Sequence, residues 1–169
     1  MFWEDCSITR MENENRVTSN HMKKRDNRKA LLNYLPCNLT EEELKTLKQQ
    51  RCSISHKNSF DVTVDHFIPI IWGHGGTIKG NVYPLDQTLN RTKSSMNPFR
   101  WMKRNEVKDK INMRLWDKLI ADLASQNQLS VSDFTRYVNW CEENKRNIDE
   151  VKSDQRLSLE IWSDKKPLK

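Results

Sequence analysis

The sequence has few of the residues on which several classes of protein depend. Its four cysteines, Cys6, Cys37, Cys52 and Cys141, are widely separated among 169 residues and include no CxxC pair. This spacing specifies neither a disulfide framework nor a cysteine zinc site, and it best fits a reducing cytosol. No apolar stretch approaches the roughly 20 residues of a membrane span, and charges stand near the N-terminus where a signal peptide needs its apolar segment. We therefore expect a cytoplasmic protein that does not associate with membranes.

Glycine is equally scarce, but it is concentrated in one place. Three of the four glycines, Gly73, Gly75 and Gly76, lie within four consecutive positions. Glycine at this density marks a loop whose backbone needs positive φ angles or approaches another group closely. We expect this glycine loop to separate two short strands.

Basic residues, by contrast, are in excess, and the net charge of the chain is +6. Such a protein attracts polyanions if its charge is clustered. Residues 87–114 include eight basic and two acidic residues, a surplus equal to the net charge of the whole chain. A second basic patch consists of Lys23, Lys24, Arg25, Arg28 and Lys29. Because basic runs are usually solvated helix faces, charge alone leaves nucleic-acid binding open.

Hydrophobic periodicity and composition divide the chain, which is long enough for one ordinary domain, into five parts. Pro36 ends a first short helix whose leucines face inward, and the capping-box pattern from Thr40 to Glu43 predicts a helix from Glu41 to Gln50. The expected parts are a flexible basic and polar arm (1–25), helical N-terminal support (26–58), a core (59–97), a helical C-terminal extension (98–147) and a tail (148–169).

The core part has the pattern of a strand, a loop, a strand and a helix. Apolar and polar residues alternate over residues 60–65, which predicts a half-buried strand that ends at His66. The glycine loop follows, and Asn81 opens a second short strand, which Pro84 must end or leave at a sheet edge. From Asp86 onward the apolar spacing is helical. We therefore expect an α+β fold in which a small ββα unit is surrounded by helices.

The region after Pro98 is expected to be helical. Apolar residues recur every four positions from Val107 to Leu123, and Ser130 and Asp133 form a capping pattern before a second apolar stripe. These stripes are typical of a packed core rather than of a cofactor site. In the tail, the apolar residues over 157–162 are expected to dock the chain as a final strand or turn.

Three polar residues of the core part have the chemistry that phosphodiester hydrolysis requires. The reaction needs an activated water, a cation and a positive surface. His66 can accept a proton from water near neutral pH. Asp65 offers a carboxylate oxygen and Asn90 a carbonyl oxygen, which suit Mg²⁺ or Mn²⁺. Neighbouring residues of a strand point to opposite faces, so Asp65 and His66 cannot easily bind the same ion unless the strand ends or bulges there. The simpler interpretation is that Asp65 binds the metal and His66 acts as the base.

The segment that contains these residues resembles the HNH motif of the His-Me finger (ββα-metal) nuclease superfamily. The order of Asp-His, Asn and Asn is especially similar to the HNH domain of the RNA-guided CRISPR nucleases. The resemblance covers about a quarter of the chain. The matching residues are Asp65-His66 with Ile68-Pro69, the Gly75-Gly76 loop, Asn81 before an apolar strand, and Asn90-Arg91-Thr92-Lys93-Ser94.

The resemblance implies an endonuclease that hydrolyses DNA and leaves 5′-phosphate and 3′-hydroxyl ends. It implies that His66 is the general base, that Asp65 and Asn90 hold one divalent ion, Mg²⁺ or Mn²⁺, and that Asn81 braces the loop that sets His66. Lys93, one helical turn after Asn90, is expected near a phosphate. The other basic residues expected to contact DNA are Arg91, Arg100, Lys103 and Arg104.

The chain departs from the family pattern in one respect. Many members carry two cysteine pairs that bind a structural zinc. Here Ser55 stands at the position that would pair with Cys52, and Asp86 and Leu89 stand where the second pair would lie. We therefore expect no structural zinc, with packing from the flanking helices holding the unit instead.

The sequence leaves two other hypotheses open. One is a catalytically inactive basic module that binds nucleic acid, and the other is a protein-interaction domain whose helices after Trp101 contact a partner. Intact Asp65, His66 and Asn90 argue against the first, because binding alone requires neither a proton acceptor nor a metal pair. A nuclease of this kind would work in a bacterial or phage-infected cell, as a phage, homing, restriction, defence or packaging enzyme. The oligomeric state is left open, a homodimer included.

Overall fold

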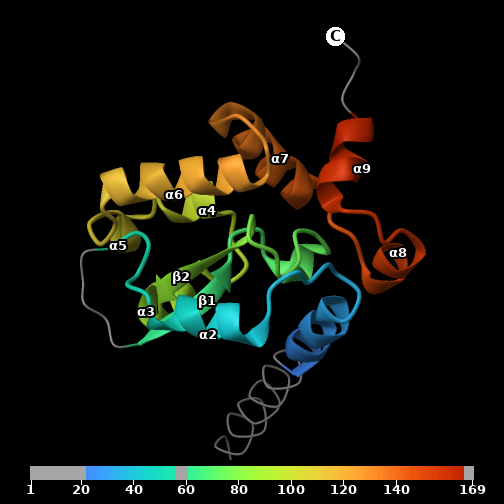
Figure 1. Cartoon of the computed structure of the whole chain (residues 1–169), viewed down its shortest axis with the longest axis horizontal. Coiled ribbons are helices and arrows are strands. Elements are labelled where there is room, and N and C mark those ends of the chain that lie inside the picture. The colour runs from blue at the N-terminus through green and yellow to red at the C-terminus, as the bar shows by residue number, and fades with distance from the viewer. Residues whose placement is uncertain (1–21, 56–60, 166–169) are drawn as a thin grey trace, which may run out of the picture.

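A computed structural model describes residues 22–55 and 61–165, and in it helices enclose a small two-stranded sheet (Figure 1). The predicted α+β class is confirmed. Residues 22–32 are helical. The other elements are α2 Glu41–Gln49, β1 Val62–His66, the 3₁₀ turn η1 Ile70–Trp72, β2 Val82–Asp86, α3 Gln87–Lys93, α4 Pro98–Trp101, α5 Asn105–Lys108, α6 Met113–Gln126, α7 Val131–Glu143, α8 Ile148–Ser153 and α9 Ser158–Asp164.

The sheet is an antiparallel pair formed by the two strands that the sequence predicted. Val62 lies opposite Asp86 at one end, and His66 lies opposite Val82 at the other. Pro84 lies inside β2, which proline tolerates because each strand of a two-stranded sheet has an outer edge. Residue 60, where the alternating pattern begins, lies outside the described residues. The connection between the strands includes η1 and the glycine loop.

Side-chain caps begin several helices where the sequence predicted them. Thr40 accepts a hydrogen bond from the N–H of Glu43, whose carboxylate accepts one from the N–H of Thr40. Asp86 accepts hydrogen bonds from two N–H groups in the first turn of α3. Ser130 accepts one from the N–H of Asp133 at 3.0 Å. These bonds satisfy N–H groups that have no partner within a helix, which explains why the predicted helix starts were correct.

The helical region after Pro98 consists of α4, α5 and α6 rather than one continuous helix. Asn97 begins α4 by accepting a hydrogen bond from the N–H of Phe99 at 3.0 Å. Asn112 begins α6 in the same way, through the N–H of Leu115 at 3.1 Å. Asparagine is favoured at helix starts because its short side chain can accept a hydrogen bond from a backbone N–H group in the first turn. The four-residue apolar repeat therefore spans more than one helix.

The tail forms α8 and α9, so the expected final strand or turn is wrong. Asn147 forms a capping box that begins α8. At the start of α9, the N–H of Leu157 donates to the carboxylate of Glu160 at 2.8 Å. The tail is docked as a helix: α9 lies against α7, where the rings of Tyr137 and Trp162 are 5.4 Å apart.

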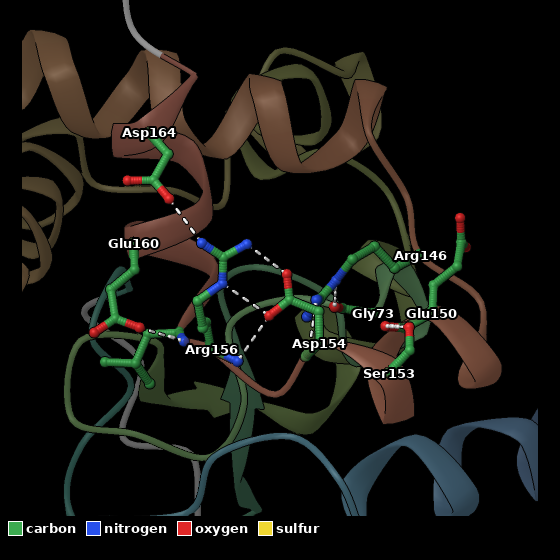
Figure 2. Close-up of polar contacts among 9 residues, drawn as sticks. Gly73, Arg146, Glu150, Ser153, Asp154, Arg156, Glu160 and Asp164 are labelled. Atoms are coloured by element: carbon green, nitrogen blue, oxygen red, sulfur yellow. Dashed lines mark hydrogen bonds and ion pairs between the residues drawn. The ribbon is translucent and has the colours of Figure 1, made fainter.

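Arginine side chains fasten this C-terminal region to itself and to the glycine loop (Figure 2). Arg156 donates hydrogen bonds to the carboxylates of Asp154 and Asp164, each at 2.7 Å. Arg146 donates to the backbone carbonyls of Gly73 at 3.1 Å and of Asp154 at 2.9 Å. The beginning of the glycine loop is therefore held by a segment much later in the chain.

The larger cluster of buried side chains joins the segment after β1 to the helices that follow α3. The ring of Phe67 lies 5.5 Å from those of Phe99 and Phe134 and 6.0 Å from that of Trp116. Burial of such rings is a main source of stability in a domain of this size. No helix in the described ranges is long and apolar enough to span a membrane.

A smaller cluster attaches the helical residues 22–32 to the rest of the molecule. As predicted, Leu31 and Leu35 are buried, and they pack with Ile70 of η1 and Val151 of α8. Residues 22–25, which we expected in a flexible arm, are helical. The remainder of the expected arm, residues 1–21, lies outside the described residues. The first helix is thus positioned next to the end of β1.

Candidate functional site

His66 is the last residue of β1, and its ring lies at the wall of a cavity. Its Nε2 lies 3.0 Å from Oγ1 of Thr77, within hydrogen-bond distance. Burial lowers the pKa of His66 to about 4, the charge of Arg28 adds to this effect, and Asp65 opposes it. The imidazole is therefore neutral near pH 7, the state in which it can accept a proton.

Asp65 takes part in a buried ion pair. Its Oδ2 lies 2.8 Å from Nζ of Lys93 and accepts a hydrogen bond from the hydroxyl of Tyr83 at 3.0 Å. Lys93 is fully buried, and its ammonium group also donates to the backbone carbonyl of His66 at 2.8 Å. Burial lowers the pKa of Lys93, while Asp65 opposes that shift. Lys93 therefore positions the end of β1, and its burial does not fit the expected contact with a phosphate.

Asn90 lies in α3 and is held against β1. Its Nδ2 donates a hydrogen bond to Oγ1 of Thr63 at 2.8 Å, and the hydroxyl of Thr63 donates to the carbonyl of Leu85 at 3.1 Å. These bonds tie α3 to both strands. Among the described residues, none donates a hydrogen bond to Oδ1 of Asn90. An amide oxygen of this kind is a suitable ligand for a hard cation.

Asn81 braces the segment that follows His66. Its Oδ1 accepts a hydrogen bond from the N–H of Ile68 at 2.7 Å, and its Nδ2 donates to the carbonyls of Ile68 and Gly76 at 3.2 and 2.9 Å. Gly75 has φ of +77°, and a Cβ atom at this position would collide with the Asn81 amide. This geometry is the arrangement that the expected bracing role requires, and it explains the need for glycine at this point of the loop.

One cavity of about 480 Å³ brings together three of the predicted site residues, Asp65, His66 and Asn90. Although neighbouring strand residues point to opposite faces, β1 ends here, so Asp65 and His66 both line the cavity. A second cavity, of about 590 Å³, lies between α2, β2 and α6, and none of the predicted site residues lines it.

Four of the predicted DNA-contacting residues are exposed: Arg91, Arg100, Lys103 and Arg104. Arg91 bonds to the side chain of Gln87 at 3.0 Å. Arg100 is paired with Glu142 and Arg104 with Glu106. Lys103 and Arg100 line a different cavity beside α7. The structure therefore does not bring Arg91, Arg100, Lys103 or Arg104 to the wall of the cavity that His66 lines.

Sequence reasoning missed several residues at this site. Lys24, Arg25 and Arg28 line the cavity, although the sequence marked them only as a basic patch. Thr77 contacts the ring of His66, and no pattern in the sequence distinguishes it. Tyr83 lies opposite Asp65 in the antiparallel pair, and the sequence predicted both strands but not this register.

The donor atoms at the cavity fit a hard divalent cation. Asp65 and Asn90 offer oxygen ligands, and two are enough for Mg²⁺, which keeps several waters when bound. A cation would share Asp65 with Lys93, because their ion pair uses Oδ2. In the described part of the chain, no group of three or more His, Cys, Asp or Glu side chains forms an alternative metal site.

Comparisons of the chain with models of protein families, with curated proteins and with solved structures found no match.

Proposed function

We propose that this chain is a metal-dependent HNH endonuclease that hydrolyses DNA phosphodiester bonds in the cytoplasm of a bacterial or phage-infected cell. The observation that supports this proposal is the presence of Asp65, His66 and Asn90 around one cavity. These residues are carried by a strand, a loop, a strand and a helix, which is the order of elements in the ββα-metal fold.

In the proposed reaction, His66 accepts the proton of the attacking water. Its ring is neutral near pH 7 and is restrained by Thr77. Asn81 holds the backbone just beyond His66, and Lys93 holds the carbonyl of His66 itself. Both are positioning residues, since they act through His66. Asp65 and Asn90 would hold one Mg²⁺ or Mn²⁺, which when bound neutralises charge on the phosphoryl group and the leaving oxygen.

The test is cleavage of supercoiled plasmid by the full chain in Mg²⁺ or Mn²⁺, with EDTA as a control. His66→Ala should reduce the nicking rate by about 100-fold or more, the usual contribution of a general base. Asn90→Ala should lower the rate and raise the cation concentration required. Asn105→Ala is the matched control, because Asn105 is an exposed asparagine that does not line the cavity. Cleavage that persists in EDTA or in His66→Ala would refute the proposal.

A second candidate function is a basic module that binds nucleic acid without cutting it. The observation that favours it is the contact of Asp65 Oδ2 with both Lys93 and Tyr83, which gives the carboxylate a structural role. This hypothesis predicts that the wild-type chain binds DNA of varied sequence and cuts none of it in either metal. Metal-dependent cleavage that is lost in His66→Ala, with DNA binding retained, would exclude it.

A further inference from the structure

The helical residues 22–32 present a cationic face to the cavity that His66 lines. Lys24, Arg25 and Arg28 form part of its wall, together with side chains from β1 and α3. All three are exposed, and none forms an ion pair with a carboxylate of the described residues. Exposed cations without an acidic partner are available to an anionic ligand.

The orientation of two of these cations, Lys24 and Arg28, follows from helix geometry. At 3.6 residues per turn, positions 24, 28 and 31 share one face of the helix. Leu31 on that face is buried against Ile70, and Ile70 itself lines the cavity. The packing that anchors the helix therefore also places Lys24 and Arg28 at the cavity. Lys23 and Lys29 belong to the same helical segment but do not line the cavity.

The charges around the cavity do not cancel. Asp65 is the only Asp or Glu among its described lining residues, and Lys93 already pairs with it. The three helix cations therefore leave the cavity positive. The charge of Arg28 reaches the ring of His66, where it contributes to the lowered pKa. A cationic wall at this position would hold an anion next to the proposed proton acceptor.

We infer that Lys24, Arg25 and Arg28 form a phosphate-binding wall that holds the backbone of a nucleic-acid strand across His66. The anion site is argued from the cavity alone, and its assignment to a phosphodiester strand rests on the proposed function. Arginine suits this task, because its planar guanidinium donates two parallel hydrogen bonds to a phosphate. The principal phosphate contacts at the reacting bond therefore come from the first helix. They do not come from the basic residues predicted from the sequence, Arg91, Arg100, Lys103 and Arg104.

The test compares two double variants with the same change of charge in the same helical segment. Arg25→Gln/Arg28→Gln removes two cations from the wall, and Lys23→Gln/Lys29→Gln removes two outside it. Both are made in a His66→Ala background, and binding of labelled DNA and RNA of one sequence is measured by fluorescence anisotropy in EDTA across a salt series. Thermal unfolding verifies that both variants fold, as expected for changes at exposed side chains.

We expect Arg25→Gln/Arg28→Gln to weaken binding by about tenfold or more and to reduce the slope of log K against log salt by about 2, because two phosphate contacts are lost. The control should weaken binding by less than about threefold. Equal weakening by both variants, no weakening by the arginine variant, or no binding of either nucleic acid by the parent would overturn the inference.

The outcomes separate this inference from the proposed function. Selective loss of binding in the arginine variant, together with a wild-type chain that cuts no plasmid, would retain the phosphate wall and refute the nuclease. Metal-dependent cleavage together with unchanged binding in the arginine variant would retain the nuclease and refute the wall.

Discussion

His66 and His74 lie on either side of η1, and they show how similar burial can serve different ends. Burial lowers the pKa of each to about 4. His74 is fully buried: its Nδ1 lies 3.0 Å from the hydroxyl of Ser158, and its Nε2 lies 2.7 Å from the carbonyl of Asn144. Both ring nitrogens therefore have protein partners, whereas the ring of His66 has one hydrogen-bond partner among the described residues, Thr77, and lines a cavity. A lowered pKa does not mark a functional histidine by itself; access to a ligand is also required.

The largest expected effect is that substitution of His66 lowers activity, whereas substitution of His74 lowers stability. His66→Ala should reduce cleavage by about 100-fold or more in a protein that still folds. His74→Ala should lower the free energy of unfolding by about 2–4 kcal/mol, since it leaves a cavity and buried polar groups without partners. Nicking rates and urea unfolding curves measure the two effects. A folded His74→Ala protein that cuts no DNA would contradict the contrast.

Lys93→Met tests whether the polar groups beside His66 also support the fold. Loss of the ammonium group leaves Asp65 without its buried cation, and we expect a loss of about 3 kcal/mol in unfolding free energy. The double variant Lys93→Met/Asp65→Asn should recover most of the lost unfolding free energy, because the asparagine amide can still accept the hydrogen bond of Tyr83. Lys79→Met, which breaks an exposed pair with Glu43, should leave stability close to wild type. If Lys93→Met is as stable as Lys79→Met, the ion pair is not structural.

The pH dependence of stability should report on His74. Its folded pKa is about 4, below the ordinary value of 6.5, so the folded state favours the neutral ring. This contribution is fully present above pH 6.5 and is lost as pH falls toward 4, by up to about 3 kcal/mol. Urea unfolding of wild type and His74→Gln between those pH values isolates it, since the other titrating groups are common to both. Parallel pH curves for the two proteins would show that His74 does not contribute.

The smallest expected effect tests the hydrogen bond between the ring of His66 and the hydroxyl of Thr77. Thr77→Val keeps the shape of the side chain but removes the hydroxyl, so the ring loses its restraint. A single hydrogen bond contributes about 0.5–1.5 kcal/mol, which corresponds to a cleavage rate roughly 2- to 10-fold lower. Thr77→Ser should restore the wild-type rate. A slow Thr77→Ser variant would instead assign the effect to packing of the threonine methyl group.

Local patterns predicted the parts of the fold that depend on neighbouring residues. The alternation before His66 predicted β1, and the side chains of Thr40 and Ser130 predicted helix starts, because strand pleating and capping act over a few residues. The tail was predicted poorly: the apolar residues of 157–162 gave too short a pattern to distinguish a helix from a strand. Contact with α7 and the Arg156 bonds of Figure 2 accompany the helix that forms there.

By itself, the sequence determined which groups could carry chemistry: it places Asp65 beside His66, and a predicted strand and helix bring Asn90 nearby. Tertiary structure alone decided which cations face the cavity. Lys93 was expected near a phosphate and is buried against Asp65, while Arg28, distant in sequence, lines the cavity with His66. The physical reason is range. Pleating and capping act between residues that are close in the sequence. The burial of Lys93 and the docking of Leu31 on Ile70 depend instead on many weak contacts between distant segments, and no local sequence pattern predicts these contacts.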